Sequence, residues 1–95
     1  MTQHWPFDQP RNCAVITLRD IVFDGAPILH VMHDSDDNGW QFLGLEDADP
    51  EKAAVVCLEE IVQLDSSVLA LADMPPGWHA WRASTSEPWV RAEKQ

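Results

Sequence analysis

Alternating acidic residues with a nearby glycine could bind a metal ion at one place in the chain. In Asp34-Ser35-Asp36-Asp37-Asn38-Gly39 the residue types follow the first half of an EF-hand calcium loop, with a glycine at the sixth position. The twelfth position, which needs a bidentate glutamate, is Leu45, and the preceding segment is strand-like rather than helical. A solvated hairpin turn is the preferred interpretation and calcium binding the alternative, so no metal site and no cofactor is predicted.

Histidines offer a second set of metal-binding groups, made up of His30, His33 and the distant His79 together with Asp34. A β-strand alternates its side chains between two faces, so the three-residue spacing places His30 and His33 on opposite faces. The two rings then cannot reach one zinc or iron ion. We expect His30 to be a hydrogen-bonded histidine in a half-buried sheet.

Tryptophans and arginines near the C-terminus could stack on a planar or anionic ligand. Trp78 and Trp81 point to opposite faces of a regular strand, and we expect Trp78 in the core. The candidate ligand-binding residues are Trp81, Arg82 and Trp89. Plain packing of these side chains is the competing interpretation.

Catalytic motifs are absent from the sequence. It contains no Gly-x-Ser-x-Gly, no His-Glu-x-x-His and no glycine-rich phosphate loop. Cys13 and Cys57 lie in apolar runs, where a free thiol usually behaves as a small core residue. We therefore predict that the protein is not an enzyme and has no catalytic residues.

The charge balance is strongly acidic, because sixteen Asp and Glu residues against six Lys and Arg give a net charge of −10. Such a chain repels phosphate backbones and anionic membrane surfaces, which argues against nucleic acid and membrane partners. Such a surface would attract a basic protein or a cation, and the plainer interpretation is that the charge serves solubility only. The candidate partner-binding residues are the acidic ones at 34–37 and 46–51: Asp34, Asp36, Asp37, Glu46, Asp47, Asp49 and Glu51.

A central hairpin over residues 28–43 organises the chain. β-Branched and aromatic residues flank the acidic turn, and Asn38-Gly39 is a strong signal for chain reversal because both residues tolerate positive φ. We accordingly expect Gly39 at positive φ. Both faces of the two strands are partly apolar, which is typical of central strands.

The remaining elements are placed around this hairpin. A loosely attached arm over 1–12 precedes a strand over 13–18, and residues 21–23 either continue that strand or form a helical turn. Asp49-Pro50 resembles a helix start. The run 53–57 is either strand or helix, and we favour a strand with a helix from Leu58. Asp65 caps a second helical segment over 66–73. A strand over 78–83, a brief edge pairing over 89–91 and a polar tail over 92–95 complete the chain.

The predicted architecture is a single α+β domain over 13–91, with a largely antiparallel sheet of four or five strands and one or two short helices packed on it. The chain begins without a basic region followed by an apolar core. No run approaches the roughly 20 apolar residues that span a bilayer. We expect a cytoplasmic protein.

Four pieces of sequence together resemble a known family: Cys-Ala-Val-Ile-Thr at 13–17, Pro27-Ile28 leading to Asn38-Gly39-Trp40-Gln41-Phe42, Val56 to Asp65, and Pro76-Gly77-Trp78-x-Ala80-Trp81-Arg82. The family is one of small bacterial domains of unknown function, some grouped with immunity proteins of polymorphic toxin systems. The match covers roughly residues 13–83 and implies an α+β fold, with no catalytic residues to carry over. The chain departs from the family's pattern at Asp65-Ser66, where an Asp-Pro helix start is common, and in its more acidic turn.

Taken together, the residues and the resemblance predict a non-catalytic binding protein, with an immunity-type inhibitor of a basic partner as the specific form. The alternative is a small-molecule sensor that uses the tryptophan-rich C-terminal region. The oligomeric state does not follow from the sequence.

Overall fold

The computed structural model describes residues 5–46 and 49–94. In chain order the elements are β1 Ala14–Leu18, α1 Arg19–Phe23, β2 His30–His33, β3 Trp40–Leu43, η1 Pro50–Lys52, β4 Ala53–Cys57, α2 Leu58–Leu64, η2 Ser66–Leu71, β5 Trp78–Trp81 and β6 Val90–Glu93, where η marks a 3-10 helix.

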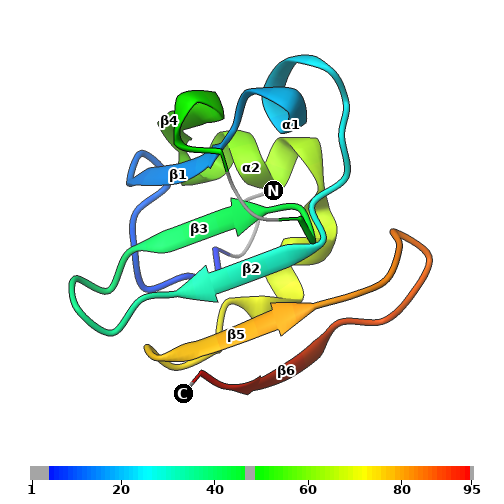
Figure 1. Cartoon of the computed structure of the whole chain (residues 1–95). Coiled ribbons are helices and arrows are strands. Elements are labelled where there is room, and N and C mark those ends of the chain that lie inside the picture. The colour runs from blue at the N-terminus through cyan, green and yellow to red at the C-terminus, as the bar shows by residue number, and fades with distance from the viewer. Residues whose placement is uncertain (1–4, 47–48, 95) are drawn as a thin grey trace.

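The strands form one sheet of order β4-β1-β3-β2-β5-β6 (Figure 1). All neighbours are antiparallel except β1 and β3, which run parallel because α1 and β2 separate them along the chain. The α+β class with a largely antiparallel sheet is confirmed. The expected four or five strands were wrong: the sheet has six, because the ambiguous 53–57 run and the C-terminal 90–93 run both pair as its two edges.

Local capping explains where the two 3-10 helices, η1 and η2, begin. The Asp49 carboxylate accepts a hydrogen bond from the Glu51 backbone N–H at 3.0 Å, and Pro50 takes the first position of η1. The Asp65 carboxylate does the same for Ser67 at 3.0 Å and so starts η2. The 53–57 strand and the helix from Leu58 are confirmed, and residues 21–23 belong to a helix rather than to the first strand.

The hairpin between β2 and β3 has the predicted position, but its turn differs in one detail. Asn38 has φ of +59°, whereas Gly39 does not lie in the left-handed region. The Gly39 backbone N–H donates instead to Asp37 Oδ1 at 2.8 Å, and this carboxylate oxygen occupies the space that a Gly39 side chain would need. The expectation of positive φ at Gly39 was therefore wrong. Glycine at this position leaves room for the Asp37 carboxylate and its hydrogen bond, rather than supplying an unusual backbone conformation.

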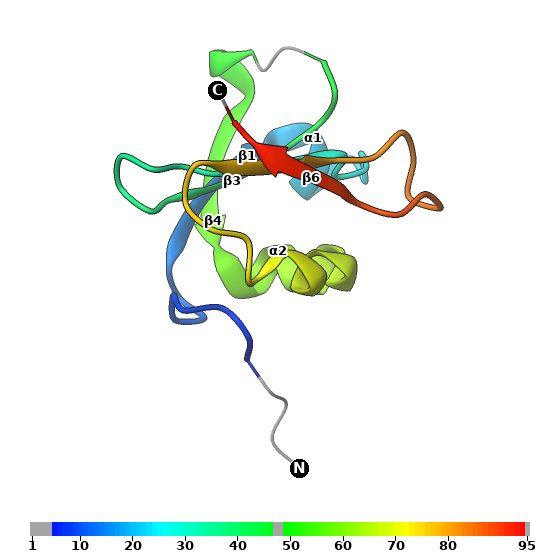
Figure 2. The ribbon, with the colours of Figure 1, turned by 90° about the horizontal axis from the view of Figure 1, so that it is seen from below.

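The core lies on one side of the sheet, where α2 and η2 pack (Figure 2). It is built from alternate residues of the strands and from the inner faces of the helical segments: Val15, Val31, Trp40, Phe42, Ala80, Leu58, Ile61, Val68 and Leu71. Phe7 joins it at 5% exposure, and Trp5 packs against it. The N-terminal arm is thus fastened from Trp5 onward, contrary to the expected loose attachment. Within the described ranges, no helix is both long and apolar enough to cross a membrane.

Candidate functional site

The strand register aligns two rows of side chains on the sheet face that lies away from α2. The first row runs Val55, Ile16, Gln41, Met32, His79 and Ala92 from one edge of the sheet to the other. The second row runs Leu43, His30, Trp81 and Val90. We call these ten side chains the open face. None of the ten residues is Asp, Glu, Lys or Arg.

Much of the open face is in contact with solvent. Val55 is 71% exposed, Val90 49% and Ile16 43%, while Met32 and Trp81 are partly buried. Among the described residues, no helix other than the three-residue η1 crosses this side of the sheet, whereas α2 and η2 cover the other side (Figure 2). An antiparallel sheet with one solvated face usually alternates apolar and polar residues. An uncharged, aromatic and solvated face is the composition of an interface centre instead.

Two histidines meet in the middle of this face. His30 Nε2 and His79 Nδ1 are 3.0 Å apart, so one ring donates its N–H to the other. The His79 ring also lies 5.0 Å from the Trp81 ring, centroid to centroid. Burial lowers the pKa of His30, and the neighbouring His79 and Lys94 lower it further. His30 is therefore neutral at pH 7, and it is hydrogen-bonded and partly buried as the sequence predicts.

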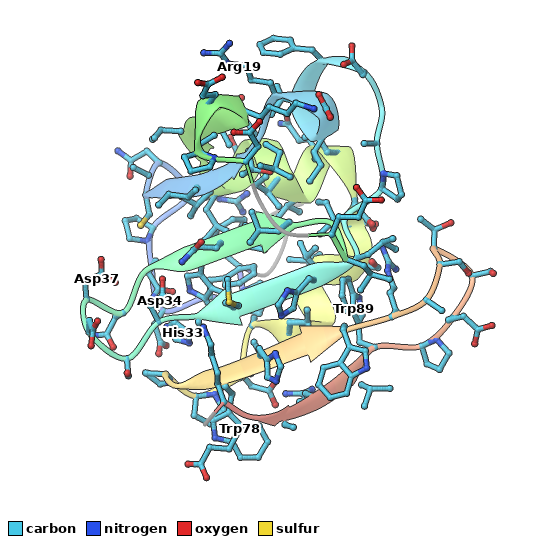
Figure 3. The ribbon with its side chains drawn as sticks, in the orientation of Figure 1. Arg19, His33, Asp34, Asp37, Trp78 and Trp89 are labelled. Atoms are coloured by element: carbon cyan, nitrogen blue, oxygen red, sulfur yellow. The ribbon has the colours of Figure 1, made fainter. Side chains whose placement is uncertain are left out.

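The acidic residues predicted to bind a partner fall into two groups, at the two ends of β3. Asp34, Asp36 and Asp37 lie in the hairpin turn before β3 (Figure 3). Glu46, Asp49 and Glu51 follow β3 in the segment that leads through η1 to β4. Asp47 lies outside the described residues. The described acidic residues thus fall into two separate groups along the chain rather than one.

The hairpin group touches the open face directly, because Gln41 Nε2 donates to Asp34 Oδ2 at 2.8 Å. Glu46 and Asp49 of the second group border a groove of about 530 Å³, whose mainly apolar floor includes Leu18 and Leu45 and whose rim also includes Asp20. Lys52 also lines this groove, and its ammonium lies 3.7 Å from the Asp20 carboxylate. The rim therefore carries more negative than positive charge.

The three predicted ligand-binding residues do not meet in one pocket. Trp81 belongs to the open face, whereas Arg82 is only 3% exposed. The Arg82 guanidinium donates to the Ile28 carbonyl at 2.9 and 3.1 Å, to Asp65 Oδ2 at 2.5 Å and to Ser67 Oγ at 3.0 Å. The Trp89 ring stacks over that guanidinium, with Arg82 Cζ 4.1 Å from the Trp89 ring centroid, and its indole N–H donates to Ser67 Oγ. Arg82 and Trp89 thus tie the end of β5 to the start of η2.

His33 is a buried polar residue whose surroundings sequence reasoning did not anticipate. Its side chain is on the core face, stacked on the Trp40 ring with centroids 4.0 Å apart. Nδ1 lies 2.7 Å from the Met74 carbonyl oxygen, which can only accept, so Nδ1 carries the proton. Nε2 is buried and has no hydrogen-bond partner among the described residues. His33 and His30 thus lie on opposite faces, as their spacing predicts.

The pairing of His30 with His79 also escaped sequence reasoning, because the two residues are 49 positions apart. The signal that points to it is compositional: alternate positions 30, 32, 79 and 81 hold His, Met, His and Trp, with no charged residue among them. No group of three or more His, Cys, Asp or Glu side chains is arranged to hold a metal ion within residues 5–46 and 49–94.

Comparisons with family models, with curated proteins and with solved structures found no match for the chain.

Proposed function

We propose that this protein is a non-catalytic binding protein whose open face covers a patch on a basic partner protein. The observation that carries the proposal is the absence of Asp, Glu, Lys and Arg from all ten positions of the open face, in a chain of net charge −10. Charged groups reach this face from residues outside the ten: the Asp34 carboxylate accepts a hydrogen bond from Gln41, and the Lys94 ammonium contacts Met32. Protein interfaces have this anatomy, with a centre depleted of charge and a polar rim.

The apolar side chains supply the driving force for association. Removing apolar surface from water is worth about 25 cal/mol per Å². Val55, Ile16 and Val90 are the most exposed apolar residues of the face and have the most surface to bury. Met32 and Trp81 lie between them in the register. Met and Trp are both enriched at interface centres, because one adapts its shape and the other buries a large area.

The acidic residues support a basic partner as part of the proposal. Asp34 contacts the open face through Gln41, while Glu46 and Asp49 line the groove that follows β3. A partner with Lys and Arg around an apolar patch would be steered onto this surface, whereas a second copy of the same acidic chain would be repelled. The resemblance to small bacterial domains grouped with immunity proteins supports an inhibitor as the specific form. A small-molecule sensor is not favoured, because the Arg82 guanidinium is already occupied by Asp65, Ser67 and Ile28.

The test compares two charge-introducing variants at exposed apolar residues. Ile16→Glu puts a carboxylate on the open face, and Phe23→Glu, at 76% exposure on α1, puts the same group outside it. Each tagged protein captures partners from the source cell, and a captured basic protein is then purified and titrated into the isotope-labelled chain. We expect wild type and Phe23→Glu to bind it, Ile16→Glu to lose binding, and amide shifts in β2, β5 and β6.

Three results would overturn the proposal. One is a captured protein that binds Ile16→Glu as tightly as wild type. Another is a set of amide shifts confined to α2 and η2. The third is a stable homodimer in sedimentation that Ile16→Glu dissociates, since the face would then be covered by a second copy rather than by a basic protein.

The acidic residues are tested separately from the face. Neutralising Asp34, Asp36 and Asp37 to Asn should slow association and flatten its salt dependence, because exposed charges act mainly on the association rate. A second variant neutralises Glu46, Asp49 and Glu51 in the same way. Surface changes of this kind usually alter stability by less than about 0.5 kcal/mol, so the fold is preserved. Unchanged association rates in both variants would contradict a basic partner, while the open face would still stand as the proposed interface.

A further inference from the structure

Two imidazole nitrogens face each other across adjacent strands of the open face. His30 Nε2 on β2 and His79 Nδ1 on β5 are 3.0 Å apart, and the two rings are inclined at 66°. Both side chains are only partly buried, so a solute can reach them from solvent. Neither nitrogen belongs to a larger cluster of metal-binding groups within the part of the chain that the structure describes.

This separation matches that of two neighbouring ligands on one metal ion. Metal–imidazole bonds are about 2.1 Å long, so two nitrogens at a right angle about the ion lie about 3.0 Å apart. Imidazole nitrogen is a ligand for Ni²⁺, Cu²⁺ and Zn²⁺, while Ca²⁺ and Mg²⁺ prefer oxygen. We propose that His30 Nε2 and His79 Nδ1 form a chelating site for a late first-row transition metal ion. The inference is independent of the proposed function.

Metal binding at this pair involves a simple proton change. In the neutral pair one ring donates its N–H to the lone pair of the other, so only one of the two facing nitrogens has a free lone pair. When the metal ion replaces the shared proton, the donor ring carries that proton on its other nitrogen instead. The neutral pair therefore releases no net proton. Two protein ligands also leave further coordination positions for water, a chelator or a side chain of another protein.

The neighbouring residues modify the site in opposite directions. Met32 lies directly opposite His79 in the register, so its thioether is on the same face and beside the pair. A thioether is a soft ligand that favours copper. Lys94 Nζ contacts Met32 Sδ at 3.2 Å, and its positive charge opposes the binding of a cation nearby. Removing that charge should therefore strengthen the site.

The probe is Ni²⁺ held by nitrilotriacetate, which leaves two adjacent coordination positions free and so selects for two protein nitrogens at this spacing. We expect wild type to bind this chelate at least about tenfold more tightly than His79→Gln or His30→Gln, since the second ligand binds intramolecularly. The double variant should bind about as weakly as either single variant, because each single variant already lacks the second ligand that chelation needs. Lys94→Gln should bind several-fold more tightly than wild type.

Each variant keeps the other histidines, so His33 and the N-terminal His4 remain as internal controls, and His4→Gln should bind like wild type. Circular dichroism verifies the fold of every variant. The proposal is overturned if the loss of affinity in the double variant equals the sum of the losses in the two single variants. It is also overturned if neither single variant loses affinity, or if His4→Gln alone abolishes the binding. Imidazole nitrogen NMR of the wild-type chain with Ni²⁺–nitrilotriacetate gives a second readout, in which the His30 and His79 signals should broaden and that of His33 should not.

Discussion

The two faces of the sheet are similar in sequence and opposite in environment. In β1, β2, β3 and β5 both faces are free of charged side chains. On the core face Val31, Phe42 and Ala80 are fully buried under the helical segments. On the open face Val55 is 71% exposed and Val90 49%. Uncharged side chains therefore stabilise the fold by burial on the core face only. On the other side the same composition leaves apolar surface available for association.

The comparison is tested most strongly by truncating one residue on each face. Phe42→Ala on the core face should lower the free energy of unfolding by about 3–5 kcal/mol, because it removes a fully buried ring and leaves a cavity. Val55→Ala on the open face should change it by less than about 0.5 kcal/mol, as is usual at an exposed site. Urea unfolding followed by circular dichroism measures both. A comparable loss in Val55→Ala would show that the open face is covered in solution.

Two arginines at the C-terminal strands give the second test. Arg82→Ala should cost about 3 kcal/mol, because it leaves Asp65 and the Ile28 carbonyl without their buried partner. The matched control is Arg91→Ala, whose ion pair with Asp73 is solvent-exposed, and it should cost far less. Thermal unfolding of the two variants decides. Equal losses would mean that the Arg82 cluster does not hold β5 to η2.

The hairpin turn provides a smaller effect. A side chain at Gly39 would displace the Asp37 carboxylate and break its hydrogen bond with the Gly39 N–H, so Gly39→Ala should cost about 1 kcal/mol. In an Asp37→Ala background the same change should cost almost nothing, since the bond is already absent. A double-mutant cycle by urea unfolding measures this coupling. Full additivity would contradict the steric role given to Gly39.

The smallest effect is the acid dependence contributed by Asp65. Burial alone would raise the pKa of this carboxyl, but hydrogen bonds from Ser67 and the ion pair with Arg82 outweigh it and lower the pKa below its ordinary value of 3.8. The unfolded chain then binds the proton more readily than the folded one, so stability rises with pH in this range. The contribution is complete above the ordinary value and lost as pH falls through the lowered one. Stability measured from pH 5 to pH 2 should fall less steeply in Asp65→Asn than in wild type.

Local chemistry in the sequence determined most of the secondary-structure elements. Asn38 sets the hairpin turn, Asp49 and Asp65 cap η1 and η2, and the β-branched run 53–57 forms a strand before α2. Each of these depends on residues within a few positions of one another, which is why the sequence sufficed. The net charge of −10 is likewise a property of composition alone.

The tertiary structure alone decided which face of the sheet is covered and which side chains meet on it. A period of two predicts that successive residues of a strand face opposite sides, but it is the same pattern whether a side is packed under α2 or left in water. His30 and His79, 49 residues apart, meet only because β2 pairs with β5 in one register. Arg82 looked available for a ligand until the fold placed Asp65, Ser67 and the Ile28 carbonyl around it. Contacts of this kind depend on strand order, which short-range patterns do not encode.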